Sequence, residues 1–382
     1  MLLRFRQWFT DIRLYFISVV FSYSYFWISL AIPYLSWRGL SGVQTFSLMS
    51  IYQIAGVLIE YPTSVLGDRY GYRRTVILGN IFSAISMFVL VQPGSYWYYA
   101  FGLFLNAVGT SLMSGNEQGM LKEISTSVRR DTALRSSVSE FVLFLSAIIG
   151  GWLGGISYVF ALYISGGLML STVFPILAIR TRRVQHPNPP NTLTIIKDGL
   201  SSFQNPIFQQ LFMILAIFGG FFFTIKSIYG SFGELYEYPV EQIGIIVGLG
   251  ALFRSAGSAI YAKYDQIIKL PLLIIMSIMI AVLAISSPLF MIIILLLFQL
   301  LVGYVLSAID GDIQDLAADH IRSSLFSFKR LIMRLFSSVY LLIYGYMVDV
   351  GKLSLMMLSL GLVMGLSTYL TRNYSRINLG QK

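Results

Sequence analysis

The chain has no cysteine and only two histidines among its 382 residues. Disulfide bonds and thiolate metal sites are therefore excluded, and a Cys/His metal cluster cannot form. No G-x-x-x-x-G-K-S/T loop is present, which argues against an ATP-driven pump in one chain. The polar groups do not cluster into a set of nucleophile, base and orienting residue. We therefore expect no metal, no cofactor and no enzyme activity.

Charged residues are also scarce, at 12% against the roughly 25% usual for soluble domains, whereas 56% of the residues are hydrophobic. Apolar runs of about 20 residues recur along the chain, each long enough to cross a hydrocarbon core of about 30 Å as a helix. The first run, residues 14–35, is too long for a signal-peptide core and lacks a cleavage site, so we expect it to be a retained helix. The sequence thus predicts an all-α polytopic protein embedded in the lipid bilayer.

Run length, with Gly, Pro and charge clusters as boundaries, predicts twelve transmembrane helices. The predicted spans are 14–36, 43–66, 75–92, 96–121, 133–156, 158–179, 207–230, 240–262, 270–287, 289–310, 326–348 and 353–371. A polar interval separates the first six spans from the last six. We predict an N-terminal six-helix bundle at 1–180, a cytoplasmic linker at 181–206 and a C-terminal six-helix bundle at 207–382.

The positive charges indicate the orientation of these spans. With the N-terminus inside, Arg38 and Lys352 fall outside, Lys226 and Arg254 lie within spans, and every other Lys or Arg lies at or near the cytoplasmic side. The positive-inside rule then places both termini in the cytoplasm. Because topology explains the net charge of +10, we expect no nucleic-acid partner. We expect a monomer in the cell (inner) membrane.

The two predicted halves share a weak internal repeat. Ser114 and Glu117, at the end of the fourth span, recur 193 positions later as Ser307 and Asp310, at the end of the tenth. Two six-span halves in the same orientation are typical of parallel-repeat transporters.

The stretch "EYPTSVLGDRYGYRR" lies between the second and third spans. It resembles the signature loop of the major facilitator superfamily, and its lead-in and the later "SGNEQGML" resemble a bacterial drug-exporter-like branch of that family. The resemblance covers the whole chain and implies twelve spans in two bundles. It assigns a conformational gate to Glu60, Pro62, Gly67, Asp68, Arg69, Gly71, Arg73 and Arg74.

Physical reasons support this pattern. Glycines permit a tight reversal where two helices come close. Asp68 can accept hydrogen bonds from a helix N-terminus or from an arginine. The alternative is that Arg69, Arg73 and Arg74 only anchor the topology.

A glycine-rich stretch in the fifth span, "SAIIGGWLGG", resembles the antiporter motif of the same superfamily. Gly150, Gly154 and Gly155 match that motif, whereas Gly151 stands in place of its proline and Ser146 in place of its first glycine. Small residues on one helix stripe also serve simple tight packing, which is the alternative reading. An arginine that the family often carries early in the fourth span is missing, and Asn106 lies in that neighbourhood.

Ionisable residues inside a membrane are costly and are functional candidates. The candidates for proton or substrate coupling are Glu117, Glu140, Lys226, Arg254, Asp310 and Arg334. From the facing spans of the superfamily fold we hypothesise two gating pairs, Glu140 with Arg254 and Glu60 with Arg334. As alternatives, Arg254 and Lys226 attract an anionic substrate, and Glu117 and Asp310 are hydrated helix ends.

Taken with the resemblance, these features predict a secondary active transporter that moves small organic compounds by alternating access. Proton-coupled efflux is the favoured mode. One alternative is an uptake symporter for a nutrient or an organic anion. The other is a non-transporting membrane scaffold or sensor with the same fold.

Overall fold

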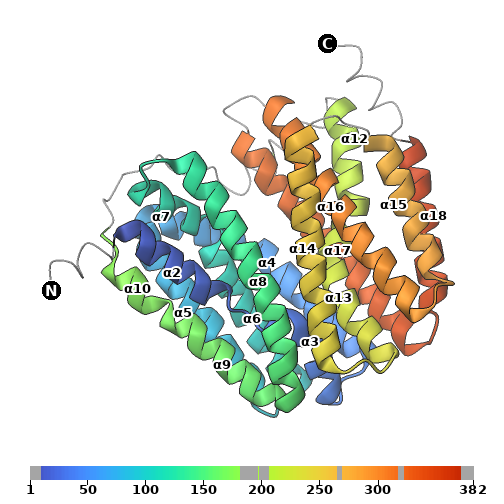
Figure 1. Cartoon of the computed structure of the whole chain (residues 1–382), viewed down its shortest axis with the longest axis horizontal. Coiled ribbons are helices and arrows are strands. Elements are labelled where there is room, and N and C mark those ends of the chain that lie inside the picture. Colours follow the sequence, from blue (N-terminus) through green and yellow to red (C-terminus); the bar gives the residue numbers. More distant parts are fainter. Residues whose placement is uncertain (1–9, 181–196, 198–205, 265–268, 317–321, 371–382) are drawn as a thin grey trace. The chain divides into compact units, whose positions relative to one another are not determined.

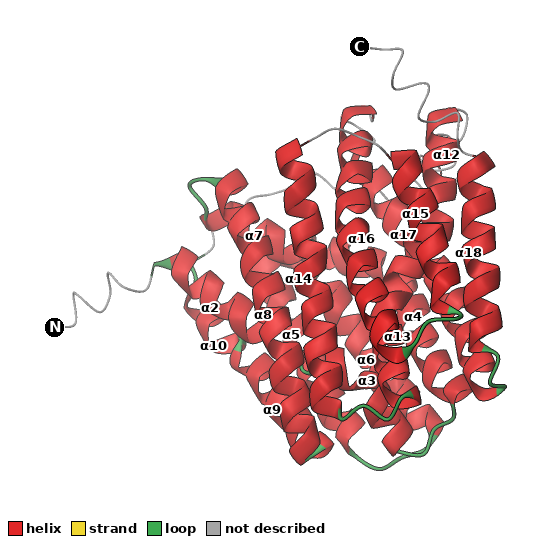
Figure 2. Ribbon diagram, turned by 45° about the vertical axis from the view of Figure 1, so that its right-hand side comes forward, coloured by secondary structure: helices red, strands yellow, loops and turns green. Residues whose placement is uncertain are grey.

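The fold was examined in a computed structural model, which describes residues 10–180, 197, 206–264, 269–316 and 322–370. Every regular element in these residues is helical, and they contain no strand (Figure 2). The predicted all-α fold class is confirmed. Most of the predicted linker, 181–206, lies outside the described residues.

Eight helical stretches among the described residues are long and apolar enough to cross a membrane. They are Asp11–Trp37, Gly42–Glu60, Tyr72–Val91, Arg130–Ile156, Tyr158–Ala178, Val240–Lys263, Pro288–Ile313 and Phe328–Asp349. Shorter apolar helices lie at Leu211–Ile225, Pro271–Leu283 and Leu353–Tyr369. A multi-pass membrane protein is thereby confirmed, while the count of twelve spans and the cytoplasmic termini stay predictions.

The chain divides into two compact units, each described here by itself. Unit 1 consists of the described residues within Met1–Leu40, Ile51–Pro189 and Gly230–Gly248. Its helices are α2 (Asp11–Tyr23), α3 (Trp27–Trp37), most of α4 (Gly42–Tyr70), α5 (Tyr72–Val91), α6 (Tyr96–Met113), α7 (Asn116–Ile124), α8 (Val128–Ile156), α9 (Tyr158–Ser171), α10 (Val173–Ala178), the end of α13 (Gly220–Leu235) and the first part of α14 (Val240–Tyr264) (Figure 1).

Unit 2 consists of the described residues within Ser41–Ser50, Pro190–Tyr229 and Leu249–Lys382. It holds the start of α4, α12 (Pro206–Ile214), η1 (Leu215–Gly219), most of α13 (Gly220–Leu235), the rest of α14, α15 (Lys269–Leu283), α16 (Pro288–Leu316), α17 (Arg322–Asp349) and α18 (Leu353–Leu370).

Local sequence explains several helix ends. Pro206 and Pro288 are the first residues of α12 and α16, where a missing backbone N–H costs nothing. Ser157 caps α9, and its side chain accepts a hydrogen bond from the Phe160 N–H. Gly71 separates α4 from α5 with a φ of 95°, in the left-handed region that glycine enters without strain.

The first predicted span is not one continuous helix. It is broken at residues 24–26, between α2 and α3. The Ser165 hydroxyl of α9 fills the break, because it accepts from the Phe26 N–H at 3.2 Å and donates to the Ser24 carbonyl at 3.2 Å. Ser146 of α8 donates to the Tyr23 carbonyl at 3.1 Å. Neighbouring helices therefore satisfy the backbone groups that the break frees, as a break inside a membrane requires.

The seventh predicted span also departs from a regular α-helix. Residues 215–219 form a π-helical turn, η1, between α12 and α13. The Tyr340 hydroxyl of α17 donates to the Ile217 carbonyl inside this turn at 3.1 Å. Such turns are frequent at functional sites.

An acidic side chain caps the start of α4 within unit 2. The Asp349 carboxylate, at the end of α17, accepts from the N–H groups of Gly42 at 2.6 Å and Val43 at 2.9 Å. The rings of Phe46 and Tyr344 pack beside this cap, with centroids 4.7 Å apart. The negative charge therefore lies where the helix dipole favours it.

Candidate functional site

The candidate site in unit 1 centres on Glu117, which lies in the first turn of α7. The fourth predicted span is interrupted just before it, since Gly115 has a φ of 77° and separates α6 from α7. The interruption gives α7 an N-terminus of its own, and such an end favours a carboxylate. Glu117 is buried, at 5% of its accessible surface.

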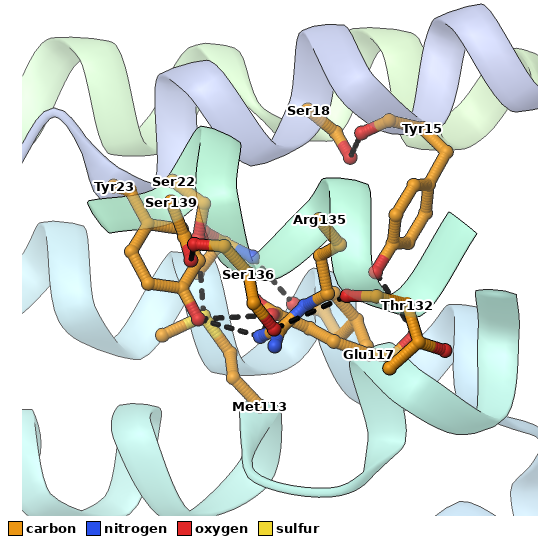
Figure 3. Close-up of polar contacts among 12 residues, drawn as sticks. Tyr15, Ser18, Ser22, Tyr23, Met113, Glu117, Thr132, Arg135, Ser136 and Ser139 are labelled. Carbon is orange, nitrogen blue, oxygen red and sulfur yellow. Dashed lines mark hydrogen bonds and ion pairs between the residues drawn. The ribbon is translucent and has the colours of Figure 1, made fainter. Parts of the chain in front are cut away.

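Arg135 of α8 forms an ion pair with Glu117. Its Nη2 atom donates to Glu117 Oε2 at 2.5 Å, and the two side chains are 13% and 6% exposed (Figure 3). A buried carboxylate is costly unless a cation and hydrogen bonds compensate it. The pair therefore makes this buried acid tolerable.

Two tyrosines of α2 surround the ion pair. The Tyr23 hydroxyl accepts from Arg135 Nη2 at 2.6 Å and donates to Glu117 Oε2 at 3.2 Å. The Tyr15 hydroxyl donates to the Glu117 backbone carbonyl at 3.3 Å, so it fixes the start of α7 (Figure 3). We call Tyr15, Tyr23, Glu117 and Arg135 the Glu117 network. It ties together α2, α7 and α8.

Glu117 also borders a narrow crevice. Its lining includes Ser18 and Ser22 of α2, Asn80 of α5 and Thr172, next to α10. The crevice has no room for a water molecule in this structure. Asn80 donates from Nδ2 to the Val76 carbonyl at 2.9 Å, whereas its buried Oδ1 has no hydrogen-bond partner. Polar and apolar side chains thus lie together along the crevice beside Glu117.

The structure places most of the predicted signature loop inside helices. Gly67, Asp68 and Arg69 belong to the last turn of α4, and only Gly71 lies between α4 and α5. Gly67 does not serve a reversal, which corrects that part of the expectation. A Cβ atom there would come within 2.7 Å of Asn116 Cγ, so glycine lets α4 approach the start of α7.

The other residues of the predicted gate are spread over two helices. Glu60 is half-buried in α4, and Pro62 lies in the same helix. Arg69 is exposed, with its guanidinium carbon 5.5 Å from the centre of the Tyr70 ring. Their role as a gate stays a prediction.

The arginines at the start of α5 differ in their surroundings. Arg73 donates from Nη1 to the Ile179 carbonyl at 2.9 Å, where it caps the end of α10, and Arg74 is exposed. The carbonyl groups at a helix C-terminus lack partners within the helix, and a positive charge is favourable there. Arg73 therefore has a structural contact in unit 1 in addition to any role in topology.

The glycines of the predicted antiporter-like motif lie at close helix contacts in unit 1. A Cβ atom on Gly150 would meet Phe26 of the broken first span, and one on Gly154 would meet Leu30 of α3. Gly151 faces Gly244 of α14. A Cβ atom added to Gly151 would lie 2.8 Å from the Gly244 Cα atom. Gly155 lies against Glu241. Close helix approach explains the small residues at these positions.

The remaining charged candidates lie in several helices. Glu140 is half-buried in α8, and Arg254 is half-buried in α14. Arg334 is half-buried in α17, and Lys226 belongs to α13. The hypothesised pairs Glu140 with Arg254 and Glu60 with Arg334 stay predictions. Asp310 of α16 is paired with Lys329 of α17, a partner that was not expected.

The partners of Glu117 were missed in the sequence. Arg135 was counted only among the topological charges at the cytoplasmic side, and Tyr23 was not singled out. A signal was present, because the Ser-Gly-Asn at 114–116 can interrupt a helix and bring Glu117 beside the next one.

The comparisons with known proteins decide the family. The family model described as Major Facilitator Superfamily matches residues 14–340. The chain belongs to the major facilitator superfamily. This family of membrane transporters indicates a transporter and not an enzyme.

Known members of the superfamily show how distant this member is. An uncharacterized MFS-type transporter, YxaM, of Bacillus subtilis (strain 168) is 21% identical over 214 residues, which are 53% of this chain and 53% of YxaM. The chain thus matches about half the length of that curated relative.

Solved structures match over nearly the whole chain. The crystal structure of the nucleoside transporter NupG has a TM-score of 0.76 at 15% identity, covering 95% of this chain and 98% of that one. A POT family transporter in complex with 5-aminolevulinic acid has a TM-score of 0.73 at 15% identity, covering 95% of each chain. At this level of identity the likeness establishes the fold alone.

Proposed function

We propose that this superfamily member is a proton-coupled secondary transporter that exports small organic compounds by alternating access, and that Glu117 is its proton-carrying acid. The observation that carries the proposal is the buried ion pair between Glu117 and Arg135. An acid and its counter-ion that can be separated by a helix movement form a natural coupling device.

The coupling follows from the cost of an unpaired buried charge. While Arg135 donates to Glu117, the carboxylate is compensated. If α8 carries Arg135 away during the transport cycle, the carboxylate is left buried without a cation, and binding a proton removes that cost. Proton binding then favours the conformation in which the pair is open, and proton release favours the closed one.

The contact between α4 and α7 supports a mechanical link to the signature motif. Gly67 of α4 lies against Asn116, the residue before Glu117. Packed helices transmit displacement because their interiors are close-packed. A movement of α4 would therefore shift the start of α7, and with it the Glu117 carboxylate. The gating pairs Glu140 with Arg254 and Glu60 with Arg334 belong to the same proposal.

Export is proposed from the glycine motif of α8 and from the drug-exporter-like stretches around Glu60 and Glu117. Uptake of a nutrient or an organic anion is the second candidate. The departures from the motif at Ser146 and Gly151 favour it. We further propose a monomer in the cell (inner) membrane.

A susceptibility screen tests the substrate. Cells with and without the protein would be exposed to dyes, antibiotics and metabolites. Nucleosides and 5-aminolevulinic acid belong in the panel, because the titles of two structural neighbours name nucleoside transport and that compound. The export proposal predicts increased resistance to at least one compound, and it is contradicted if no compound shifts.

Purified protein in lipid vesicles tests the direction and the proton coupling. A pH gradient imposed across the vesicle membrane should drive a substrate from the screen against its own gradient, in the direction opposite to the protons. Movement in the same direction as the protons would establish uptake symport. Substrate movement that ignores the pH gradient would contradict proton coupling.

A further inference from the structure

Within unit 2, the start of α4 is attached to the end of α17 by polar and apolar contacts. The Asp349 carboxylate accepts from the first two N–H groups of α4, at 2.6 and 2.9 Å. A Cβ atom on Gly345 would lie 2.8 Å from the Gly42 carbonyl oxygen, so the two backbones touch. The rings of Phe46 and Tyr344, both buried, pack beside them. We call these five residues the α4 latch.

Asp349 is unfavourably placed for its own helix. It is the last residue of α17, and the C-terminal end of a helix dipole disfavours a carboxylate. The helix ends without help from this side chain. Gly351, with a φ of 66°, donates its N–H to the Val348 carbonyl at 3.1 Å, and the Lys352 N–H donates to the Met347 carbonyl at 2.9 Å. The contact with α4 is therefore what favours an acid at this position, and such local conflicts are expected at functional sites.

The helix α4, in turn, does not need Asp349 in order to begin. The Ser41 hydroxyl accepts from the Gln44 N–H at 3.3 Å, and the Gln44 side chain accepts from the Ser41 N–H at 3.1 Å. This reciprocal pair is a capping box. The N–H groups of Gly42 and Val43 lie at an exposed helix end, where water can replace the carboxylate. The latch can therefore be released without unwinding the helix.

The position of α4 in the chain connects the latch to movement. Residues 42–50 belong to unit 2, whereas α4 belongs to unit 1 from residue 51 onward. In unit 1 the hydroxyl groups of Tyr52 and Thr110, in α6, are hydrogen-bonded at 3.2 Å. No glycine or proline occurs from residue 43 to residue 55, so no kink is expected where α4 passes from one unit to the other. A displacement of α4 with unit 1 would therefore pull its first turn away from α17.

We infer that the α4 latch is a releasable closure of the transporter, which is made when this end of the chain is closed and must open each time substrate passes there. The predicted orientation places the latch at the outer side of the membrane, where an exported compound leaves. The inference rests on the proposed alternating access, but not on Glu117 or on the identity of the substrate.

The rate of thiol labelling tests the latch. The chain has no cysteine, so Val348→Cys supplies a unique thiol. Val348 is half-buried, and its Cγ1 atom lies 3.0 Å from where a Cβ atom of Gly42 would be. A bulky maleimide reagent should reach this thiol only after α4 has moved away. The purified full chain in detergent should therefore be labelled slowly.

Removing the acid should speed the labelling. In the Val348→Cys background, Asp349→Ala should be labelled about tenfold faster, a shift of about 1.4 kcal/mol in the opening equilibrium. Asp349→Asn keeps an acceptor oxygen but not the charge, and it should give a smaller increase. An unchanged labelling rate in Asp349→Ala would overturn the inference. If Asp349→Ala does not fold, an unchanged rate in Asp349→Asn would overturn it instead.

Two control variants separate the latch from simple fraying of the helix end. Ser41→Ala removes the capping box of α4 but keeps Asp349. Lys352→Gln removes an exposed charge three residues after Asp349. Both should raise the labelling rate far less than Asp349→Ala does. If Ser41→Ala raises it as much, fraying accounts for the effect and the inference is overturned.

A covalent lock tests the role of the latch in transport. In Gly42→Cys with Val348→Cys, the sulfur of residue 348 would take the place of a Cγ1 atom that lies 3.0 Å from the Cβ position of residue 42, within reach of a disulfide. Loss of free thiols shows that the bond has formed.

With a substrate from the screen, oxidation of the double variant in lipid vesicles should stop transport, and reduction should restore it. Each single variant should ignore the oxidant. Transport at the full rate by the cross-linked protein would overturn the inference. If the unaltered chain moves no substrate, the proposed function fails, whereas the labelling rates still decide whether the latch opens.

Discussion

Replacing Arg135 by glutamine is expected to destabilise the chain by about 3 kcal/mol, the lower end of the 3–5 kcal/mol typical of breaking a buried ion pair. The side chains of Arg135 and Glu117 are only 13% and 6% exposed, so the remaining carboxylate would lie buried without its cation. The lower end is expected because Arg135 Nε has no hydrogen-bond partner, which makes the original pair less than ideal.

The magnitude can be separated from simple loss of packing by a double-mutant cycle. Glu117→Gln alone should also destabilise the chain, because Arg135 then lacks its anion. The double variant should be more stable than the sum of the two single changes predicts, with a coupling energy of about 2 kcal/mol or more. Unfolding of the purified protein in detergent, followed by circular dichroism, measures all four proteins. Strictly additive effects would refute the claim that the two charges compensate each other.

Three further predictions concern packing and backbone hydrogen bonds, and the same unfolding assay measures each. Ser165→Ala should lower the free energy of unfolding by about 1–3 kcal/mol, because a buried N–H and a partly buried carbonyl at the break of the first span lose their partner. The control Ser171→Ala, whose hydroxyl bonds only within its own helix, should cost far less, and equal losses would contradict the reasoning. Gly67→Ala should lower the free energy of unfolding by about 1–3 kcal/mol, because the added methyl group forces α4 and α7 apart. The control Gly167→Ala, with nothing within 4 Å of its Cβ position, should be neutral or stabilising by up to about 1 kcal/mol. Asp349→Ala should lower the free energy of unfolding by about 0.5–2 kcal/mol, because the cap on α4 is lost. Asp349→Asn keeps an acceptor oxygen and should cost less. Unchanged stability of Asp349→Ala would show that the cap is not needed.

The positions of the helices could be predicted closely because each membrane-spanning helix needs an apolar run of about 20 residues, which is visible in the sequence. The second predicted span, 43–66, corresponds to α4, and the fifth, 133–156, ends with α8 at Ile156. The all-α membrane fold and the family also followed from the sequence. The signature motif itself carried the resemblance that the family match then confirmed.

Interruptions inside the helices were not predictable from local sequence. The break at residues 24–26 contains neither glycine nor proline, and the hydroxyl that satisfies it comes from Ser165, 139 residues beyond Phe26. The cap on α4 comes from Asp349, 307 residues beyond Gly42. Such features depend on which helices become neighbours, and hydrophobic periodicity does not specify that.

The candidate site was predicted only in part. Glu117 and Asp310 were recognised as costly charges near the membrane, but their cations were not. Arg135 and Lys329 looked like ordinary positive-inside charges, because each lies near the cytoplasmic end of a predicted span. The repeat of 193 positions linked the two acids in the sequence, and the structure adds that their cations are repeated as well.

The most direct test of the central claim compares two transport modes of Glu117→Gln in lipid vesicles, with a substrate found by the screen. Glutamine keeps the size of the side chain but cannot carry a proton. The account predicts that the variant still exchanges labelled for unlabelled substrate across the membrane, yet no longer accumulates substrate when a pH gradient is imposed. Accumulation driven by the pH gradient at the level of the unaltered protein would contradict the role of Glu117 as the proton-carrying acid.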